Sequence, residues 1–439
     1  MEREIPIFDF VSAISEAVDL VSPALYLHHQ KVACIAYRIA EKMELSTEEI
    51  QDIILASMLH DIGAFLTGEQ IKKLRFSFEE SELYKHSLLG YKLLKNFEPL
   101  SNAARLIKYH HKYYDQSNHR IPIGSYIIHL ADFLCILFNE HYEFMDQVPE
   151  VLEKIGFIKN KFHPDALNAF YQLAGHEYFW VEAFSASFSE SILKKALFSK
   201  KITGVDTLKN FAKVIAYIID FRSGFTATHS SGVAAVAREL TAILGFSESE
   251  CELMEIAGLL HDFGKLAVPN DILEKDGKLN NTEFNSIRKH TYYTHVVLSK
   301  INGLEDIAAW AAFHHEKQSG NRYLFRTKNE EFSKLARIMA VSDVLSALTE
   351  DRPYRPGMNR VKTTIILVDM ARNGGIDKNI VHQVVVNFIR INNARIRAQR
   401  EARNEYVRFR ELIPKRKPVN TSRRLYEASG NSAVHSVIC

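Results

Sequence analysis

The chain carries the same ordered set of histidines and aspartates twice, and this duplication constrains its fold more than any other feature. Each set contains a histidine, a His-Asp pair, a second histidine, a His-His pair and an aspartate within an apolar segment. The first histidine precedes the His-Asp pair by 32 positions in both copies, and the second precedes the His-His pair by 24 in both. The first set is His28, His60, Asp61, His86, His110, His111 and Asp132, and the second is His229, His261, Asp262, His290, His314, His315 and Asp343. Such self-similarity predicts two copies of one domain.

The offset between the copies shows how they differ in length. It is 201 residues at the first histidine and the His-Asp pair, 204 at the next histidine and the His-His pair, and 211 at the final aspartate. Insertions of three and then seven residues in the second copy account for these steps. A chain of 439 residues is also long enough for two domains. We expect the first repeat over residues 1–195, the second over 205–395, and a basic, partly flexible tail over 396–439.

Helical patterns agree between the copies and predict an all-α fold of two tandem helical bundles. Val233, Val236, Ala237 and Leu240 fall on one face of a 3.6-residue period, and residues 32–43 show the same pattern. A capping box precedes each helix that leads to a His-Asp pair: Ser46 with Glu49, and Ser247 with Glu250. Alternating strand patterns are scarce.

Composition limits the classes of function. Lysine plus arginine (55) nearly balances aspartate plus glutamate (53), so any anion binding must be local. No run reaches the ~18 apolar residues that a membrane span needs, and we expect no membrane association. The four cysteines form no CxxC pair, which is typical of a reducing compartment, and we expect a cytoplasmic protein.

The duplicated residue types are those that hold metal ions. In the second copy, we assign His229, His261, Asp262 and Asp343 to one ion, and Asp262, His290, His314 and His315 to another. Two ions bridged by a carboxylate, about 3.5–4 Å apart, clamp a phosphoryl group and lower the pKa of a bridging water. Because no thiolate takes part, two divalent ions of iron or manganese are favoured, while zinc or nickel would also fit. A single His-Asp dipeptide is usually structural, but matched spacings in two copies favour metal binding.

These residues carry a resemblance to a known family. The stretches "AGLLHDFGKLAVPNDILEKDGKLNNTEF", "AAFHHEKQSGNRY" and "ARIMAVSDVLSALTEDRPYRPGM" make residues 206–390 resemble the HD-GYP branch of the HD phosphohydrolases. The resemblance implies a helical bundle with two or three metals that hydrolyses a cyclic dinucleotide, either cyclic GMP-AMP or cyclic di-GMP, to a linear product. By the same resemblance, Asp262 and Lys265 are catalytic, with Lys265 meeting the scissile phosphate and assisting the leaving oxygen.

The match departs from the family pattern at several positions. In the loop after the His-His pair, Ser319, Arg322 and Leu324 replace residues that are usual in the family, whereas Tyr323 keeps its place. Phe225 stands where some members have a glutamate for a third metal, which favours a two-metal site. Candidate substrate-binding residues are Tyr323, Arg352 and Arg355.

The first copy resembles the superfamily more weakly. Its seven ligand-type residues would still form a metal site, but Ala64 replaces the lysine and the GYP loop has no counterpart. We expect a degenerate repeat with a structural or regulatory role.

Two other functions stay open at this stage. If neither centre hydrolyses a substrate, the protein is a catalytically silent signalling scaffold. Alternatively, it is an HD phosphohydrolase that acts on another nucleotide. Cations accumulate from Arg395 onward without interleaved aromatic residues, so nucleic acid is an unlikely partner. The sequence indicates neither an oligomeric state nor an input signal.

Overall fold

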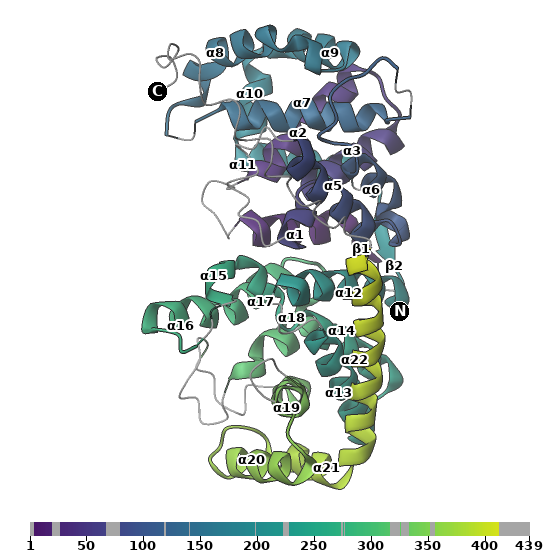
Figure 1. The fold of residues 1–439 in the computed structure, drawn as a ribbon, viewed down its shortest axis with the longest axis vertical. Coiled ribbons are helices and arrows are strands. Elements are labelled where there is room, and N and C mark those ends of the chain that lie inside the picture. The colour runs from purple at the N-terminus through teal and green to yellow at the C-terminus, as the bar shows by residue number, and fades with distance from the viewer. Residues whose placement is uncertain are drawn as a thin grey trace, which may run out of the picture.

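Helices dominate the structure and form two lobes stacked along its long axis (Figure 1), which confirms the predicted all-α class. This computed structural model describes residues 4–19, 27–66, 80–117, 120–139, 141–197, 199–222, 228–273, 275, 277–316, 325, 333–351 and 356–411. The two lobes correspond to the two copies of the repeated residue set.

The first lobe contains ten α-helices and three short 3-10 helices (η) among the described residues. They are α1 (Ile7–Asp19), α2 (His28–Lys42), α3 (Thr47–Leu59), η2 (Ile62–Leu66), α5 (Glu80–Leu94), η3 (Glu98–Leu100), α6 (Ser101–Ile107), α7 (Ile123–Leu137), α8 (Phe144–Phe157), η4 (Lys159–Lys161), α9 (Pro164–Ala174), α10 (Glu177–Phe184) and α11 (Ala186–Ala196).

The second lobe repeats the order of elements around its ligands. It contains α12 (Val205–Arg222), α13 (His229–Ile243), α14 (Glu248–Leu260), η5 (Phe263–Ala267), α15 (Asn270–Leu273), α16 (Asn281–Arg288), α17 (His290–Leu298), α18 (Glu305–Ala312), η6 (Phe313–His315), α19 (Lys334–Thr349), α20 (Arg360–Arg372), α21 (Lys378–Val386) and α22 (Phe388–Glu411).

Both predicted capping boxes are present at the start of α3 and α14. The hydroxyl oxygens of Ser46 and Ser247 each accept the backbone N–H of the glutamate three residues later, at 3.3 Å. Each glutamate in turn accepts the backbone N–H of its serine, at 3.0 Å for Glu49 and 2.8 Å for Glu250. Because these boxes start the helices that lead into the His-Asp pairs, they fix the same local geometry in both lobes.

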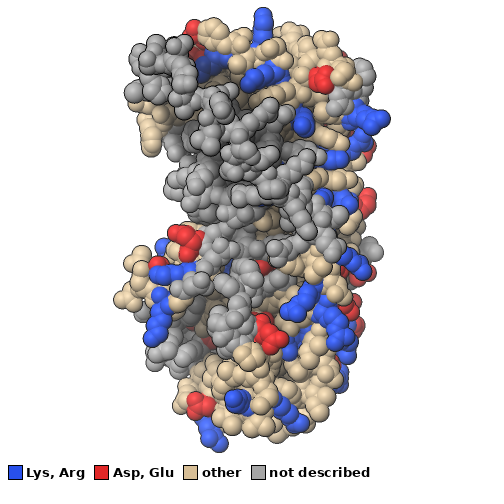
Figure 2. Space-filling model, viewed as in Figure 1, with Lys and Arg blue, Asp and Glu red and all other residues tan. Residues whose placement is uncertain are grey.

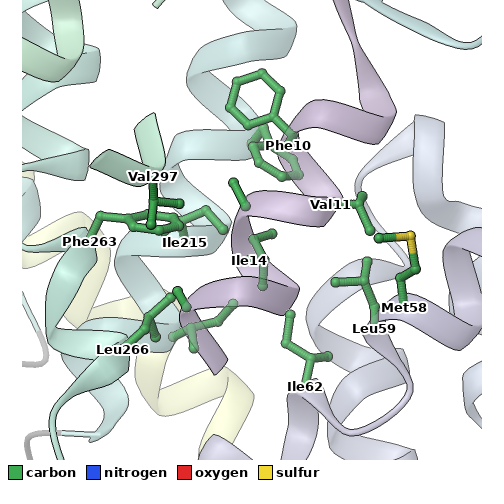
Figure 3. Packing of buried hydrophobic residues seen from close by; sticks show 14 of the residues in the cluster. Phe10, Val11, Ile14, Met58, Leu59, Ile62, Ile215, Phe263, Leu266 and Val297 are labelled. Carbon is green, nitrogen blue, oxygen red and sulfur yellow. The ribbon is translucent and has the colours of Figure 1, made fainter. Parts of the chain in front are cut away.

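Helix α1 lies in the seam between the lobes and belongs to the core of both (Figure 3). It packs on α3 of the first lobe and on η5 and α17 of the second. Its buried residues Phe10, Val11 and Ile14 lie between Leu59 and Ile62 on one side and a group from the second lobe on the other. That group comprises Ile215, Phe263, Leu266 and Val297.

A short antiparallel pair of strands adds to the seam. Strand β1 (Glu4–Pro6) pairs with β2 (Lys201–Thr203), with Ile5 opposite Ile202. The strand immediately before α1 is therefore tied to the strand that leads into α12, and the two lobes share one continuous core.

Helix α22 extends beyond the predicted end of the second repeat. The boundary at residue 395 falls inside this helix, which packs on α13 and buries Ala402. The basic segment thus begins as a helix seated on the second lobe. Residues 412–439 of the predicted tail lie outside the described residues. Within the part of the chain that is described, no helix is long and apolar enough to cross a membrane.

Candidate metal centres

The second lobe brings its seven predicted ligands together, six of them at the ends of helices and one within a helix. Five elements contribute: His229 opens α13, His261 and Asp262 follow α14, His290 opens α17, His314 and His315 end η6, and Asp343 lies within α19. All are buried except His315, which is partly exposed. The local structure explains the clustering, because four helix ends and the middle of α19 each direct one or two polar side chains into the bundle.

The carboxylate of Asp262 stands between two groups of ligands. Its Oδ2 atom lies 3.2 Å from Nε2 of His261, and its Oδ1 atom lies 3.4 Å from Nε2 of His290. The ligand atoms of His229, His261 and Asp343 lie within 4.8 Å of one another, and so do those of His290, His314 and His315. Asp262 therefore has one oxygen beside each group, as a bridging ligand requires.

The orientation of the imidazole rings fits divalent ions. Nδ1 of His261, His290 and His314 donates to the backbone carbonyls of Gly258, Ile287 and Ala311, at 2.8, 2.6 and 2.6 Å. In a neutral ring this leaves Nε2 as a lone-pair acceptor. Nε2 of His290 lies only 3.4 Å from Nε2 of His314, so two lone pairs face each other. A cation between them removes that repulsion.

Burial sets the protonation states that metal binding needs. It lowers the pKa of His290, His314 and His315 to about 3, so these rings are neutral. Burial alone would raise the pKa of Asp262, but His261 and Lys265 hold it well below its usual value. The second group of ligands thus combines neutral imidazoles with an ionised carboxylate, whereas the carboxylates of Glu350 and Asp262 outweigh burial and raise the pKa of His229 and His261.

Lys265 points into the centre from η5. Its ammonium donates to Oδ2 of Asp262 at 2.6 Å, in a side chain that is 26% exposed. The predicted catalytic lysine therefore lies beside the bridging carboxylate, where it adds positive charge to the rim of the site.

Sequence reasoning missed Glu350, which supports His229 from behind. Nδ1 of His229 donates to Oε2 of Glu350 at 3.0 Å, and the amide of Gln399 on α22 donates to the same oxygen at 3.3 Å. Such outer partners hold a ligand ring in the correct orientation and tautomer. The signal was present, because Glu350 follows Asp343 by two helical turns and so falls on the same face.

The first lobe assembles its seven predicted residues in the same arrangement. Asp61 has Oδ2 at 3.4 Å from Nε2 of His60 and Oδ1 at 3.3 Å from Nε2 of His86. Nε2 of His28 lies 3.2 Å from Oδ1 of Asp132, and Nε2 of His86 lies 3.4 Å from Nε2 of His110. His111 completes the second group. The geometry of a bridging aspartate is thus present twice.

Three substitutions distinguish the two centres. Ala64, which is fully buried, stands in place of Lys265, and Asn139 is in register with Glu350. His29 stands where the second copy has Ser230, and one of its ring nitrogens lies within 4.8 Å of the ligand atoms of His60 and Asp61. The first centre therefore has a further imidazole but lacks the ammonium group.

Several predicted residues cannot be placed. Phe225, the altered loop with Tyr323, and both Arg352 and Arg355 lie outside the described residues.

Comparison with protein-family models now identifies the class of protein. Residues 25–135 match a model described as an HD domain, and residues 213–380 match a second model with the same description. Together these matches span more than half of the chain. The protein belongs to the HD domain family and carries two HD domains in tandem, as predicted.

Its relatives are cyclic dinucleotide phosphodiesterases. The chain is 28% identical over 389 residues to 3'3'-cGAMP-specific phosphodiesterase 1 of Vibrio cholerae, covering 85% of this chain and 90% of the relative. It is 29% identical over 248 residues to phosphodiesterase 3 of the same organism, covering 56% of this chain and 53% of the relative. A cyclic di-GMP phosphodiesterase of Pseudomonas aeruginosa is 35% identical over 162 residues, 37% of this chain and 39% of that protein.

A solved structure shares the fold. The crystal structure of a cyclic GMP-AMP-specific phosphodiesterase of Vibrio cholerae, V-cGAP3, superposes with a TM-score of 0.59 at 20% identity. The superposition covers 91% of this chain and 98% of the other, so the tandem arrangement extends through both.

Proposed function

We propose that the second HD domain hydrolyses a phosphodiester bond of a cyclic dinucleotide, cyclic GMP-AMP or cyclic di-GMP, to give a linear dinucleotide. The observation that carries this proposal is the position of Asp262, with one carboxylate oxygen beside each group of imidazoles. The names of the relatives support the substrate class. The buried cysteines Cys34 and Cys251 remain as thiols, which supports a reducing cytoplasmic location.

The residues of the centre divide between two ions. His229, His261, Asp262 and Asp343 would hold the first, and Asp262, His290, His314 and His315 the second. When bound, such ions supply Lewis acidity toward a phosphoryl group and a water of lowered pKa. Iron or manganese is favoured for the mixed imidazole and carboxylate donors.

The protein groups around the ions orient ligands and supply charge. Backbone carbonyls and Glu350 hold the rings by their Nδ1 atoms, which keeps each Nε2 atom directed inward. Lys265 places an ammonium at the rim, where it stabilises negative charge on a departing oxygen. Ala64 offers no such group in the first lobe, and we propose a structural or regulatory role for that repeat.

A substrate panel tests the reaction. Protein loaded with iron or manganese should convert cyclic GMP-AMP or cyclic di-GMP to the linear dinucleotide, measured by chromatography. Hydrolysis of non-cyclic nucleotides alone would contradict the proposed substrate class. Stoichiometric metal without turnover of any nucleotide would instead indicate a silent scaffold.

Glu350→Gln should weaken metal binding, because the neutral amide no longer balances the imidazole N–H of His229. Loss of an outer partner of this kind typically costs about 10–100-fold in metal affinity or activity. Competition with a chelator gives the affinity directly. Glu401→Gln, an exposed position on α22, is the matched control and should leave the affinity unchanged. Equal affinities for the two variants would remove Glu350 from the centre.

A further inference from the structure

A cavity of about 540 Å³ opens at the seam between the lobes, away from the described metal ligands. Three helical segments line it: the end of α5 from the first lobe, α12 from the second, and the last turns of α22. Its cations are Lys92, Lys95, Lys213 and Arg408, and its tyrosines are Tyr217 and Tyr406. We call this the seam cavity. Basic side chains are visible at this level of the molecule, beside the upper end of α22 (Figure 2).

The lining of the seam cavity is much more positively charged than the chain as a whole. The whole chain has a formal net charge of only +2, yet the cavity lining has four cations and a single carboxylate, Glu405. Burial, and then the nearby Lys95, lower the pKa of Lys92. The ammonium groups therefore repel one another, and a bound anion would relieve this repulsion.

A second cavity adjoins the first on α5. It has a volume of about 340 Å³ and is lined by Tyr91, Arg105, Lys108, Tyr109 and Arg120. Nζ of Lys108 lies 5.2 Å from the ring centre of Tyr91 and 4.8 Å from that of Tyr109. Cations interleaved with tyrosine faces thus continue from the seam cavity to the end of α6.

This combination matches the chemistry of a nucleotide. Phosphates are bound by lysine and arginine side chains, and planar bases stack on tyrosine rings. Asn96 and Asn210 add amide donors and acceptors to the lining, and the volume lies within the range of small-molecule sites. We propose that the seam cavity binds a nucleotide, with its phosphates at Lys92, Lys213 and Arg408 and its base against Tyr217, which lies one helical turn from Lys213 on α12. This site is distinct from both metal centres, and the inference holds whether or not the protein hydrolyses cyclic dinucleotides.

Direct binding tests the proposal without an activity assay. The probe is GTP with a fluorescent group on the ribose, and its anisotropy is followed with the full-length chain. Binding should persist in Asp262→Asn but weaken more than about tenfold in the double variant Lys213→Glu with Arg408→Glu. The double variant Arg400→Glu with Arg403→Glu, two exposed changes on α22 outside the lining, is the charge-matched control and should leave affinity unchanged.

Other outcomes would overturn the proposal. Loss of probe binding in Asp262→Asn with retention in the double variant would place the nucleotide at the metal centre. If the wild-type chain does not bind the probe at about 1 mM, the seam cavity is not a nucleotide-binding site. Displacement by a single-stranded oligonucleotide at far lower concentration than by GTP would indicate a nucleic-acid surface instead.

Variants of Tyr217 distinguish the binding of a nucleotide from the binding of a simple anion. Tyr217→Phe keeps the ring and should hold the probe affinity within about twofold, whereas Tyr217→Ala should weaken it about tenfold. Pyrophosphate should compete much less well than GTP. If pyrophosphate competes equally, or if the two tyrosine variants bind alike, the base is not recognised and the proposal fails.

Discussion

Asp262→Asn should abolish hydrolysis and remove metal from the second lobe. The amide keeps the volume of the carboxylate but has one acceptor oxygen and no negative charge, so it cannot serve both ligand groups. We expect turnover to fall more than about 100-fold, beyond the range seen when only an outer partner is lost. Metal analysis and chromatography of the product measure the two effects, and circular dichroism checks that the helices remain.

Asp61→Asn in the first lobe is the matched comparison. It makes the same change in the same geometry, so any general effect of losing a buried carboxylate appears in both variants. Metal content should fall, but turnover should stay within about threefold of wild type if catalysis resides in the second lobe. The opposite result, with Asp61→Asn inactive and Asp262→Asn active, would assign the reaction to the first lobe.

Gly264→Ala should displace α17 and disturb the second group of ligands. A Cβ atom on Gly264 would lie 1.9 Å from the carbonyl oxygen of His290 and 2.8 Å from the backbone nitrogen of Thr294. Both are backbone atoms, so the helix that begins at His290 must move as a unit. We expect a loss of about 1–3 kcal/mol or more in the free energy of unfolding. Metal stoichiometry should fall as well.

Two other glycines serve as controls for this effect. Gly63→Ala creates the same clash in the first lobe, 2.0 Å from the carbonyl oxygen of His86, and should leave metal in the second lobe. Gly156→Ala, exposed in α8 with no atom near the added carbon, should stabilise the protein by about 0.5–1 kcal/mol. Thermal denaturation and metal analysis of the three variants give the comparison. If Gly264→Ala binds metal and unfolds as wild type does, the close approach of η5 and α17 is not required.

The sequence was sufficient to predict which described histidines and aspartates cluster, because each occupies a fixed place in a repeated order. His229 and His290 begin helices and His261 follows one, so local signals and spacing locate them without knowledge of the tertiary structure. Glu350 was missed because its role depends on the distant residues His229 and Gln399, which only the folded chain brings near.

The same reasoning explains why the seam and the last helix were not foreseen. An apolar face predicts that α1 is buried, but it does not say that the face is covered by two domains at once. The basic residues of α22 resembled a solvated tail, although Arg395 is buried and donates to the carbonyl of Thr349 at 3.2 Å. Long-range partners of this kind are not encoded in local periodicity.

The position of α1 has a consequence for anyone who trims the chain. Phe263 and Leu266 flank Lys265, and both belong to the group that packs against α1 (Figure 3). A fragment that starts at residue 205 would leave both side chains of η5 exposed to solvent, next to Lys265. Such a fragment would expose apolar surface, aggregate readily and hold Lys265 less firmly. The amino-terminal helix is therefore needed for the correct structure of the second lobe.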